Sequence, residues 1–199
     1  TCDVCRERSR LSAAVLSVRP GGGGLRVVAR GLRNPFGLAV DAETRRLYAT
    51  DNGRDKAAAP AETLVEIRPG RFFGWPRCWA SARLKRLVGR CAGVTRPLAF
   101  LEPHSSADGL VVYRGDSFGP RYDGNVFVAL WGEYLSSRHG RRVDRVVLHQ
   151  SGDPRKARVT PFVRGLDHPL AVTVDGEGAL LVADYGRGIV YRIQASSAS

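Results

Sequence analysis

Short runs of apolar residues, bounded by Gly, Pro, Asn or Asp, recur along the whole chain. Many of them alternate with polar residues, and their short length with period two predicts β-strands rather than helices. Turn clusters such as Pro-Gly close several of them and supply the reversals that antiparallel strands need. The runs interpreted as strands are 14–18, 37–40, 47–50, 63–67, 110–113, 145–148, 179–183 and 189–193.

One stretch of the chain is present twice and part of it a third time. NPFGLAVD at 34–41 matches HPLAVTVD at 168–175, and LYATDNGR at 47–54 matches LLVADYGR at 180–187. A partial third copy is DGNVFVALWG at 123–132. Repeats of about 40 to 50 residues with short strands are typical of β-propellers, in which stacked blades bury both faces of each sheet. The fold class predicted is therefore all-β, a β-propeller.

The repeats also divide the chain into blades. Residues 1–20 are interpreted as the end of one blade, 21–70 as a second, 71–152 as a third and 153–193 as the last. The third carries a long insertion, 71–108, with little strand patterning. About three and a half four-stranded blades do not close a ring, so one flank of the stack is expected to be open.

Charge is the most unusual bulk property, since the formal net charge is +12. Nearly all of it comes from arginines spread along the chain, and the only lysines are Lys56, Lys85 and Lys156. No basic helix, zinc finger or base-stacking motif accompanies them, so nucleic-acid binding is not predicted. No apolar run approaches the length of a transmembrane helix, and no membrane span is predicted.

Four cysteines occur, as Cys2 and Cys5 in a CxxC pattern and as the pair Cys78 and Cys91. The second spacing is too wide for a usual zinc site, and no thioredoxin-like pattern follows the first. Disulfides in an exported protein are the favoured use. Cys78–Cys91 would close a long loop and Cys2–Cys5 a tight one, but spacing leaves the connectivity open.

The most reactive-looking groups lie at strand ends, where a propeller has its mouth. Arg33 and Asn34 precede one predicted strand, and DNGRD at 51–55 follows the next. His168 occupies in the second copy the position of Asn34. Spacing alone leaves Arg33 open between a solvated arginine and an anion clamp, and it favours an exposed loop residue for His104.

Four motifs in order resemble the glucose/sorbosone dehydrogenase family of soluble quinoproteins. They are GLRNPFGLAVDAETRRLYATDNGRD at 31–55, GRFFGWPRCW at 70–79, HSSADGLVVYRGDSFGPRYDGNVFVALWG at 104–132 and HPLAVTVDGEGALLVADYGRGIVYRI at 168–193. The resemblance covers nearly the whole chain and implies the C-terminal half of a six-bladed propeller, periplasmic or secreted. It also implies that the family's general-base histidine lies before Thr1, so no turnover by this chain alone is expected.

The resemblance implies a pyrroloquinoline quinone (PQQ) cofactor and a calcium ion at the mouth. Arg33 and Asn34 would hold the cofactor's carboxylates, and the backbone carbonyls of Gly53 and Arg54 would bind calcium. Residues implied to line the cofactor site are Tyr113, Trp131 and His168. The reaction implied is hydride transfer from a sugar or aldehyde carbon to the quinone, and then to an external electron acceptor.

Three positions depart from the family pattern. Ala61 stands where an aspartate is common, Ser136 where an arginine is expected (Arg138 is close), and His168 where the last blade has an arginine. The alternative hypothesis is a non-catalytic propeller of the NHL type that binds a protein or glycan through its mouth.

Overall fold

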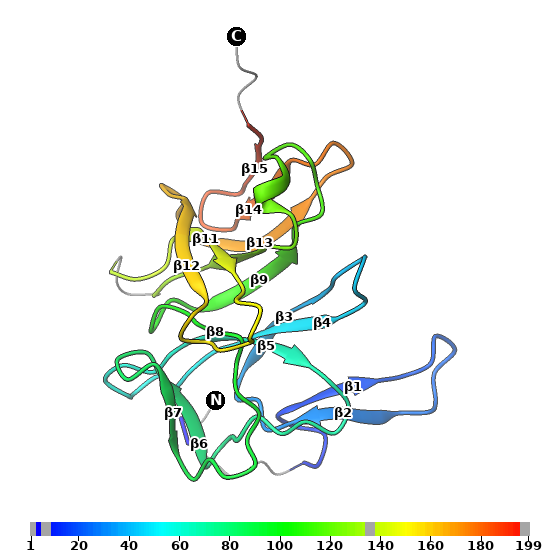
Figure 1. Ribbon diagram of the computed structural model, residues 1–199, viewed down its shortest axis with the longest axis vertical. Helices are drawn as coiled ribbons and strands as arrows, with labels where there is room; N and C mark the ends of the chain where they lie inside the picture. The colour runs from blue at the N-terminus through cyan, green and yellow to red at the C-terminus, as the bar shows by residue number, and fades with distance from the viewer. Residues whose placement is uncertain (1–2, 5–8, 134–137, 196–199) are drawn as a thin grey trace.

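The computed structural model describes residues 3–4, 9–133 and 138–195 of the chain, and these form an all-β structure (Figure 1). The single helical element among them is a 3-10 turn, Pro120–Tyr122. The strands are β1 (Ala14–Ser17), β2 (Arg26–Arg30), β3 (Pro35–Val40), β4 (Leu47–Asp51), β5 (Thr63–Ile67), β6 (Cys78–Ser81), β7 (Arg86–Gly89), β8 (Ala99–Phe100), β9 (Ala107–Val112), β10 (Val126–Leu130), β11 (Arg142–Val147), β12 (Arg158–Val163), β13 (Pro169–Val174), β14 (Leu180–Asp184) and β15 (Ile189–Ile193).

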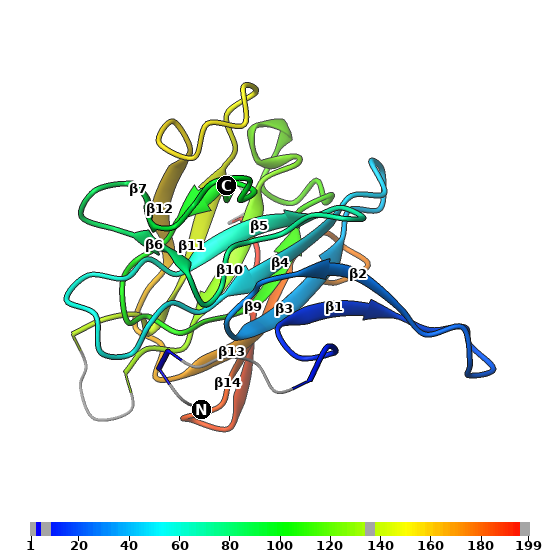
Figure 2. The same cartoon turned by 90° about the horizontal axis from the view of Figure 1, so that it is seen from below.

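Three antiparallel sheets form the body of the molecule. Their strand orders are β3-β4-β5-β8, β9-β10-β11-β12 and β13-β14-β15. The first strands of the three sheets, β3, β9 and β13, contact one another in that order. Figure 2 shows the sheets stacked with successive rotations, as propeller blades are. The predicted fold class is confirmed: the chain is part of a β-propeller.

The sheets group the strands differently from the expected segments. β2 pairs with β1 and not with β3, β8 completes the first sheet, and β12 completes the second. The sheet limits therefore fall later in the chain than residues 20, 70 and 152, and the last sheet has three strands among the described residues rather than four. The 71–108 insertion also contains a hairpin, in which β6 pairs with β7 from Cys78↔Gly89 to Ser81↔Arg86.

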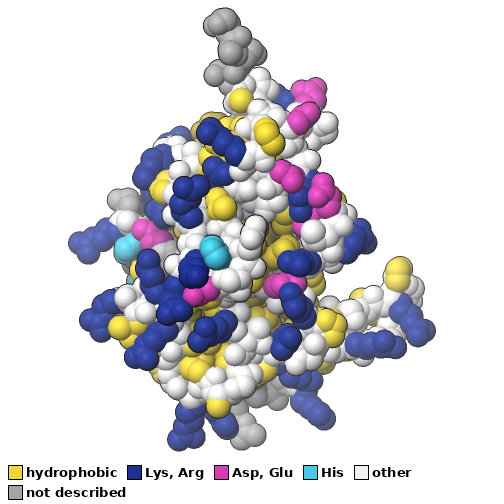
Figure 3. Space-filling model, viewed as in Figure 1, with side chains coloured by type: hydrophobic (Ala, Val, Ile, Leu, Met, Phe, Trp, Pro, Cys, Tyr) yellow, Lys and Arg dark blue, Asp and Glu magenta, His cyan; other side chains and the backbone are white. Residues whose placement is uncertain are grey.

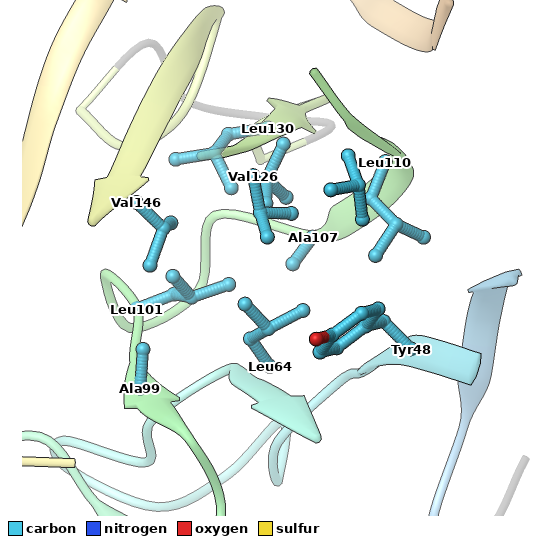
Figure 4. Close-up of a cluster of buried hydrophobic side chains, with 11 residues drawn as sticks. Tyr48, Leu64, Ala99, Leu101, Ala107, Leu110, Val126, Leu130 and Val146 are labelled. Atoms are coloured by element: carbon cyan, nitrogen blue, oxygen red, sulfur yellow. The ribbon is translucent and has the colours of Figure 1, made fainter. Parts of the chain in front are cut away.

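β10 shows why a central strand here is apolar throughout. All five of its residues, VFVAL, are buried. Because successive side chains point to opposite faces, Val126, Val128 and Leu130 pack toward the first sheet, in the cluster of Figure 4, and Phe127 and Ala129 pack toward the third. Each large side chain buried in this way contributes roughly 1.5 to 3 kcal/mol. These two layers hold the three sheets together.

The outer face of the first sheet is only partly covered. Val15 and Ala29 of the β1–β2 hairpin pack on Ala49 and Val65. Along β3, by contrast, the side chains of Phe36, Leu38 and Val40 are 54%, 56% and 55% exposed. The face of the first sheet is therefore open along β3, as the count of blades predicted.

Glycine permits the closest approach between sheets. A Cβ on Gly37 would lie 2.4 Å from the carbonyl oxygen of Asp108 on β9. The Gly37 amide donates to the hydroxyl of Thr50 (2.9 Å), and that hydroxyl donates to the same Asp108 carbonyl (2.8 Å). The first and second sheets thus meet backbone to backbone, with one buried hydroxyl between them.

Replacing Gly37 with Ala is expected to lower the free energy of unfolding by about 1 to 3 kcal/mol, because the added methyl group has no space between the sheets. Gly176→Ala is the control, since a Cβ there has nothing within 4 Å. Chemical denaturation of both variants measures the difference. Equal stabilities would contradict the inferred close approach.

Candidate functional site

A hollow of about 580 Å³ lies at the end of the sheets where β3, β9 and β13 begin. We call it the mouth hollow, and its volume suits a small ligand. The residues that line it are Arg33, Asn34, Asn52, Gly53, Arg54, Asp55, Glu62, His104, Ser106, Gly132 and Glu133. Four of the predicted site residues, Arg33, Asn34, Gly53 and Arg54, are therefore brought together.

The repeated motif builds the same local structure in two sheets. The carboxylate of Asp51, at the end of β4, accepts the backbone amides of Arg33 (3.0 Å) and Asn34 (2.8 Å). At the end of β14, Asp184 accepts those of Asp167 and His168, both at 2.8 Å. Each aspartate fixes the loop that enters the neighbouring strand, so Asn34 and His168 occupy equivalent places, as the repeat predicted.

Arg33 is held tightly and is only 9% exposed. Its guanidinium donates to the Gly53 carbonyl and to the carboxylate of Asp55 (Nη2–Oδ2, 2.6 Å), and it lies 5.5 Å from the ring of Trp75. Its Nε is buried and has no hydrogen-bond partner among the described residues. Arg33 is therefore not a solvated arginine: it pairs with Asp55 and Asp3 of the chain itself, and one donor remains to be satisfied.

Arg54 has a similar environment on the adjoining side of the hollow. Its guanidinium lies 4.7 Å from the ring of Trp79 and bonds Asp3 (Nη2–Oδ2, 3.2 Å). Both tryptophans belong to the 71–108 insertion, so that segment supports the two arginines from behind. Sequence reasoning missed this role, because nothing in the spacing connects Trp75 or Trp79 with the arginines.

Three carboxyl groups near the mouth hollow have raised pKa values, and the sequence did not reveal them. Burial raises the pKa of Glu62 to about 7, with neighbouring Asp51 adding to the effect, and burial raises the pKa of Asp51 to about 6. Asp108, from the next sheet, has a pKa raised by burial to about 6. Asn52 joins the sheets, because its Oδ1 accepts the backbone amide of Ala107 at 2.7 Å.

These pKa values predict a pH-dependent stability. A carboxyl whose folded pKa is raised binds its proton more tightly in the native state, so stability falls as pH rises from about 4.5, its unfolded pKa, to about 7, the folded pKa of Glu62. Glu62→Gln keeps an oxygen for the Gly53 amide and removes the charge. We expect the free energy of unfolding of this variant to fall less between pH 5 and pH 8.

Urea denaturation across that pH range is the measurement. Glu177→Gln is the control, because Glu177 is exposed and should leave the pH profile of the parent chain unchanged. A parallel profile for Glu62→Gln and the parent chain would contradict a raised pKa at Glu62.

Trp131 and His168 form a stacked pair beside the hollow. Their rings are 4.0 Å apart and tilted by 11°, and His168 Nδ1 lies 3.1 Å from the Trp131 carbonyl oxygen. They come from the second and third sheets, and neither lines the hollow itself. Their predicted role in lining the cofactor site stays a prediction. His104 does line it as a half-buried loop residue, and its ring lies 6.1 Å from that of His139.

Tyr113 was predicted to line the cofactor site, and the structure places it elsewhere. It follows β9 at the end of the sheets opposite the mouth, and it is fully buried. Its hydroxyl donates to the Gly178 carbonyl (2.7 Å) and accepts the Phe118 amide (3.2 Å). Because its polar atom is satisfied inside the core, Tyr113 is a packing residue here and does not contact the mouth hollow.

The disulfide between Cys78 and Cys91 is confirmed, with its sulfurs 2.06 Å apart. It joins the start of β6 to the loop after β7. Cys2, Cys5 and Ser136 lie outside the described residues. Among the part of the chain that is described, no group of three or more His, Cys, Asp or Glu residues is arranged to hold a metal ion.

Comparison with known proteins agrees with this geometry. The sequence profile of the glucose/sorbosone dehydrogenase family matches residues 18–183, which include the residues of the mouth hollow and the first aspartate-capped loop. The chain belongs to this family. Family membership favours a dehydrogenase over an NHL-type binding propeller.

Solved structures show the same fold. A glucose dehydrogenase is 21% identical with a TM-score of 0.66, and the alignment covers 86% of this chain and 46% of that one. A Thermus thermophilus protein described as a putative oxidoreductase (glucose dehydrogenase) is 26% identical with a TM-score of 0.58, covering 88% and 48%. An uncharacterised Synechocystis protein is 28% identical over 124 residues, which is 60% of this chain and 26% of that protein. The chain thus spans about half the length of these solved dehydrogenases.

The donors at the mouth hollow fit an anionic cofactor better than they fit calcium. Arg33 has an unpaired buried Nε, and the side chain of Asn34 is exposed beside it, so carboxylate groups would find both a cation and an amide. The Gly53 carbonyl, expected as a calcium ligand, instead accepts a hydrogen bond from Arg33. A calcium ion at this carbonyl would share the oxygen with the Arg33 guanidinium.

Proposed function

We propose that this chain forms the cofactor-binding part of a PQQ-dependent sugar or aldehyde dehydrogenase. The observation that carries the proposal is the position of Arg33, which lines the mouth hollow of a propeller of the dehydrogenase family. Its side chain is nearly buried, and its Nε has no hydrogen-bond partner among the described residues. Arg33 already pairs with Asp55 and Asp3, and only its Nε is left without a partner in the part of the chain that the structure describes. A carboxylate of PQQ is a group that this N–H could bind.

Bound PQQ would supply the electron-accepting carbonyl for a hydride from a sugar or aldehyde carbon. The chain's own residues bind and orient the cofactor. Arg33 and Asn34 hold carboxylates, and Asp51 fixes the loop that carries both. The stacked pair of Trp131 and His168 lies beside the hollow, where it would border a bound cofactor.

Calcium at the Gly53 and Arg54 carbonyls stays a prediction from the family resemblance. The ion would share the Gly53 carbonyl oxygen with Arg33, and no step is assigned to it. An external electron acceptor and an exported location belong to the same proposal. The Cys78–Cys91 disulfide supports export, because disulfides persist in oxidising compartments. No helix in the described chain is long and apolar enough to span a membrane.

Equilibrium dialysis of the purified chain against PQQ tests the proposal. The parent chain should retain the quinone absorbance, and Arg33→Gln should bind at least about ten-fold more weakly, since one charge-assisted contact of roughly 1.4 kcal/mol corresponds to a factor of ten. Arg121→Gln removes one positive charge at the 3-10 turn, which lies away from the hollow, and serves as the control.

Equal weakening by Arg33→Gln and Arg121→Gln would show a general charge effect and contradict the assigned site. No retention by the parent chain at any concentration tested would contradict the cofactor itself.

A further inference from the structure

A second charged feature lies away from the mouth hollow, on the 71–108 insertion. Between Glu66 and Glu102 the sequence contains no acidic residue, yet it contains eight basic ones. Figure 3 shows basic side chains over the lower part of this face, around β6 and β7, with few acidic side chains among them. The eight basic residues are Arg68, Arg71, Arg77, Arg83, Lys85, Arg86, Arg90 and Arg96.

Part of this surface is concave. A groove of about 360 Å³ runs between the β6–β7 hairpin and the loop before β12. Lys85, Arg86 and Arg96 line it from the insertion, and Arg155 lines it from the loop. We call it the basic groove. The Cys78–Cys91 disulfide closes the hairpin that forms one wall, so that wall is covalently restrained.

The cations of the insertion wall are uncompensated. Lys85, Arg86 and Arg96 are exposed, and within the described chain none of them has an ion pair. The one carboxylate that lines the groove, Asp153, is already paired with Arg155 (Nη2–Oδ2, 2.9 Å). Three positive charges at one groove without a partner raise the local concentration of anions.

Apolar side chains also line the groove. Leu87, Val94 and Phe100 are partly exposed there, and Pro97 is buried. Apolar side chains beside polar and charged ones are the usual composition of a protein-binding surface. A sugar polyanion or a phosphate backbone needs the cations but gains little from the apolar side chains.

We propose that the basic groove binds an acidic protein segment, in which carboxylates flank an apolar anchor. The carboxylates pair with Lys85, Arg86 and Arg96, and the anchor contacts Leu87 and Phe100. This proposal is independent of the cofactor assigned to the mouth hollow, because the two sites share no residue.

The probe is a fluorescein-labelled peptide with two glutamates on each side of a central phenylalanine, measured by anisotropy at low salt. A second peptide has serine in place of the phenylalanine, and heparin is the competitor. Lys85→Gln, Arg86→Gln and Arg96→Gln are combined in one variant. The control combines Arg19→Gln, Arg26→Gln and Arg164→Gln, which removes the same charge from exposed arginines outside the groove.

We expect the phenylalanine peptide to bind, and the groove variant to bind it about ten-fold more weakly while the control variant retains the affinity. The serine peptide should bind several-fold more weakly than the phenylalanine peptide. Equal losses of peptide affinity in the two variants would overturn the proposal, because they would show that the net charge of the chain attracts the peptide. Equal binding of the two peptides, or groove-dependent binding of heparin with none of peptide, would overturn it in favour of a simple polyanion. Near-identical circular dichroism of the two variants controls for folding.

Discussion

Replacing Phe127 with Ala is expected to lower the free energy of unfolding by about 3 to 5 kcal/mol, the usual range for a large aromatic side chain removed from a core. Phe127 is fully buried in the middle of β10. Its ring lies 4.8 Å from that of Phe162 and 5.7 Å from that of Tyr113, both edge to face. The substitution leaves a cavity in the layer between the second and third sheets, where the aromatic contacts are most numerous.

Phe36→Ala makes the identical chemical change on β3, where the side chain is 54% exposed. Its expected loss is below about 1 kcal/mol. Urea denaturation of the two variants separates the effect of burial from that of residue type. Similar losses would mean that the face of β3 is covered in solution, and would contradict the open flank described above.

Arg114→Gln is expected to lower the free energy of unfolding by about 3 kcal/mol at pH 7, because it leaves a buried carboxylate without its counter-ion. The Asp41 side chain is 2% exposed and accepts two hydrogen bonds from Arg114, Nε–Oδ1 at 2.9 Å and Nη2–Oδ2 at 2.8 Å. These bonds tie the turn after β3 in the first sheet to the end of β9 in the second.

The effect should depend on pH with a definite sign. The hydrogen bonds from Arg114 hold the pKa of Asp41 well below its ordinary value. A depressed pKa means that the pair stabilises the fold above the unfolded pKa of about 4 and loses that contribution as pH falls toward the folded pKa. The stability difference between the parent chain and Arg114→Gln should therefore be largest near neutrality and shrink below pH 4.

Arg68→Gln provides the comparison, since Arg68 makes an exposed ion pair with Glu66 (Nη2–Oε2, 2.7 Å) and surface pairs contribute little. We expect no resolvable change in stability from it at any pH. A pH-independent loss in Arg114→Gln would contradict the ionic origin of the effect and indicate lost packing.

Local pattern was sufficient for most strands and for the repeat. Period-two alternation and turn residues belong to contiguous sequence, so 37–40, 47–50 and 63–67 were all predicted within the strands that form. The match of Asn34 with His168 was also readable, because each sheet needs an aspartate to cap its entering loop. Asp51 and Asp184 supply it in both copies.

Sheet membership could not be read in the same way. β2 follows a predicted blade start and β8 has only two residues, yet hydrogen bonding assigns them to sheets that local pattern did not indicate. A strand's period tells which face is buried, but its partner depends on which neighbour approaches. For the same reason Tyr113, which lies in a family motif, was predicted to line the site. It lies instead where Gly178 and Phe118 satisfy its hydroxyl.

The strands, the repeat, the family and the arginine and amide at the mouth could be read from the sequence, because each strand and each copy of a motif is a contiguous stretch. Three features became visible in the folded chain alone. The Arg33 guanidinium donates to the Gly53 carbonyl, Trp75 and Trp79 lie against the two arginines, and Asp108 of the second sheet hydrogen-bonds Asn52 of the first. These features join segments distant in sequence, and their energies depend on burial. Burial is set by the packing of sheet on sheet and not by any single stretch.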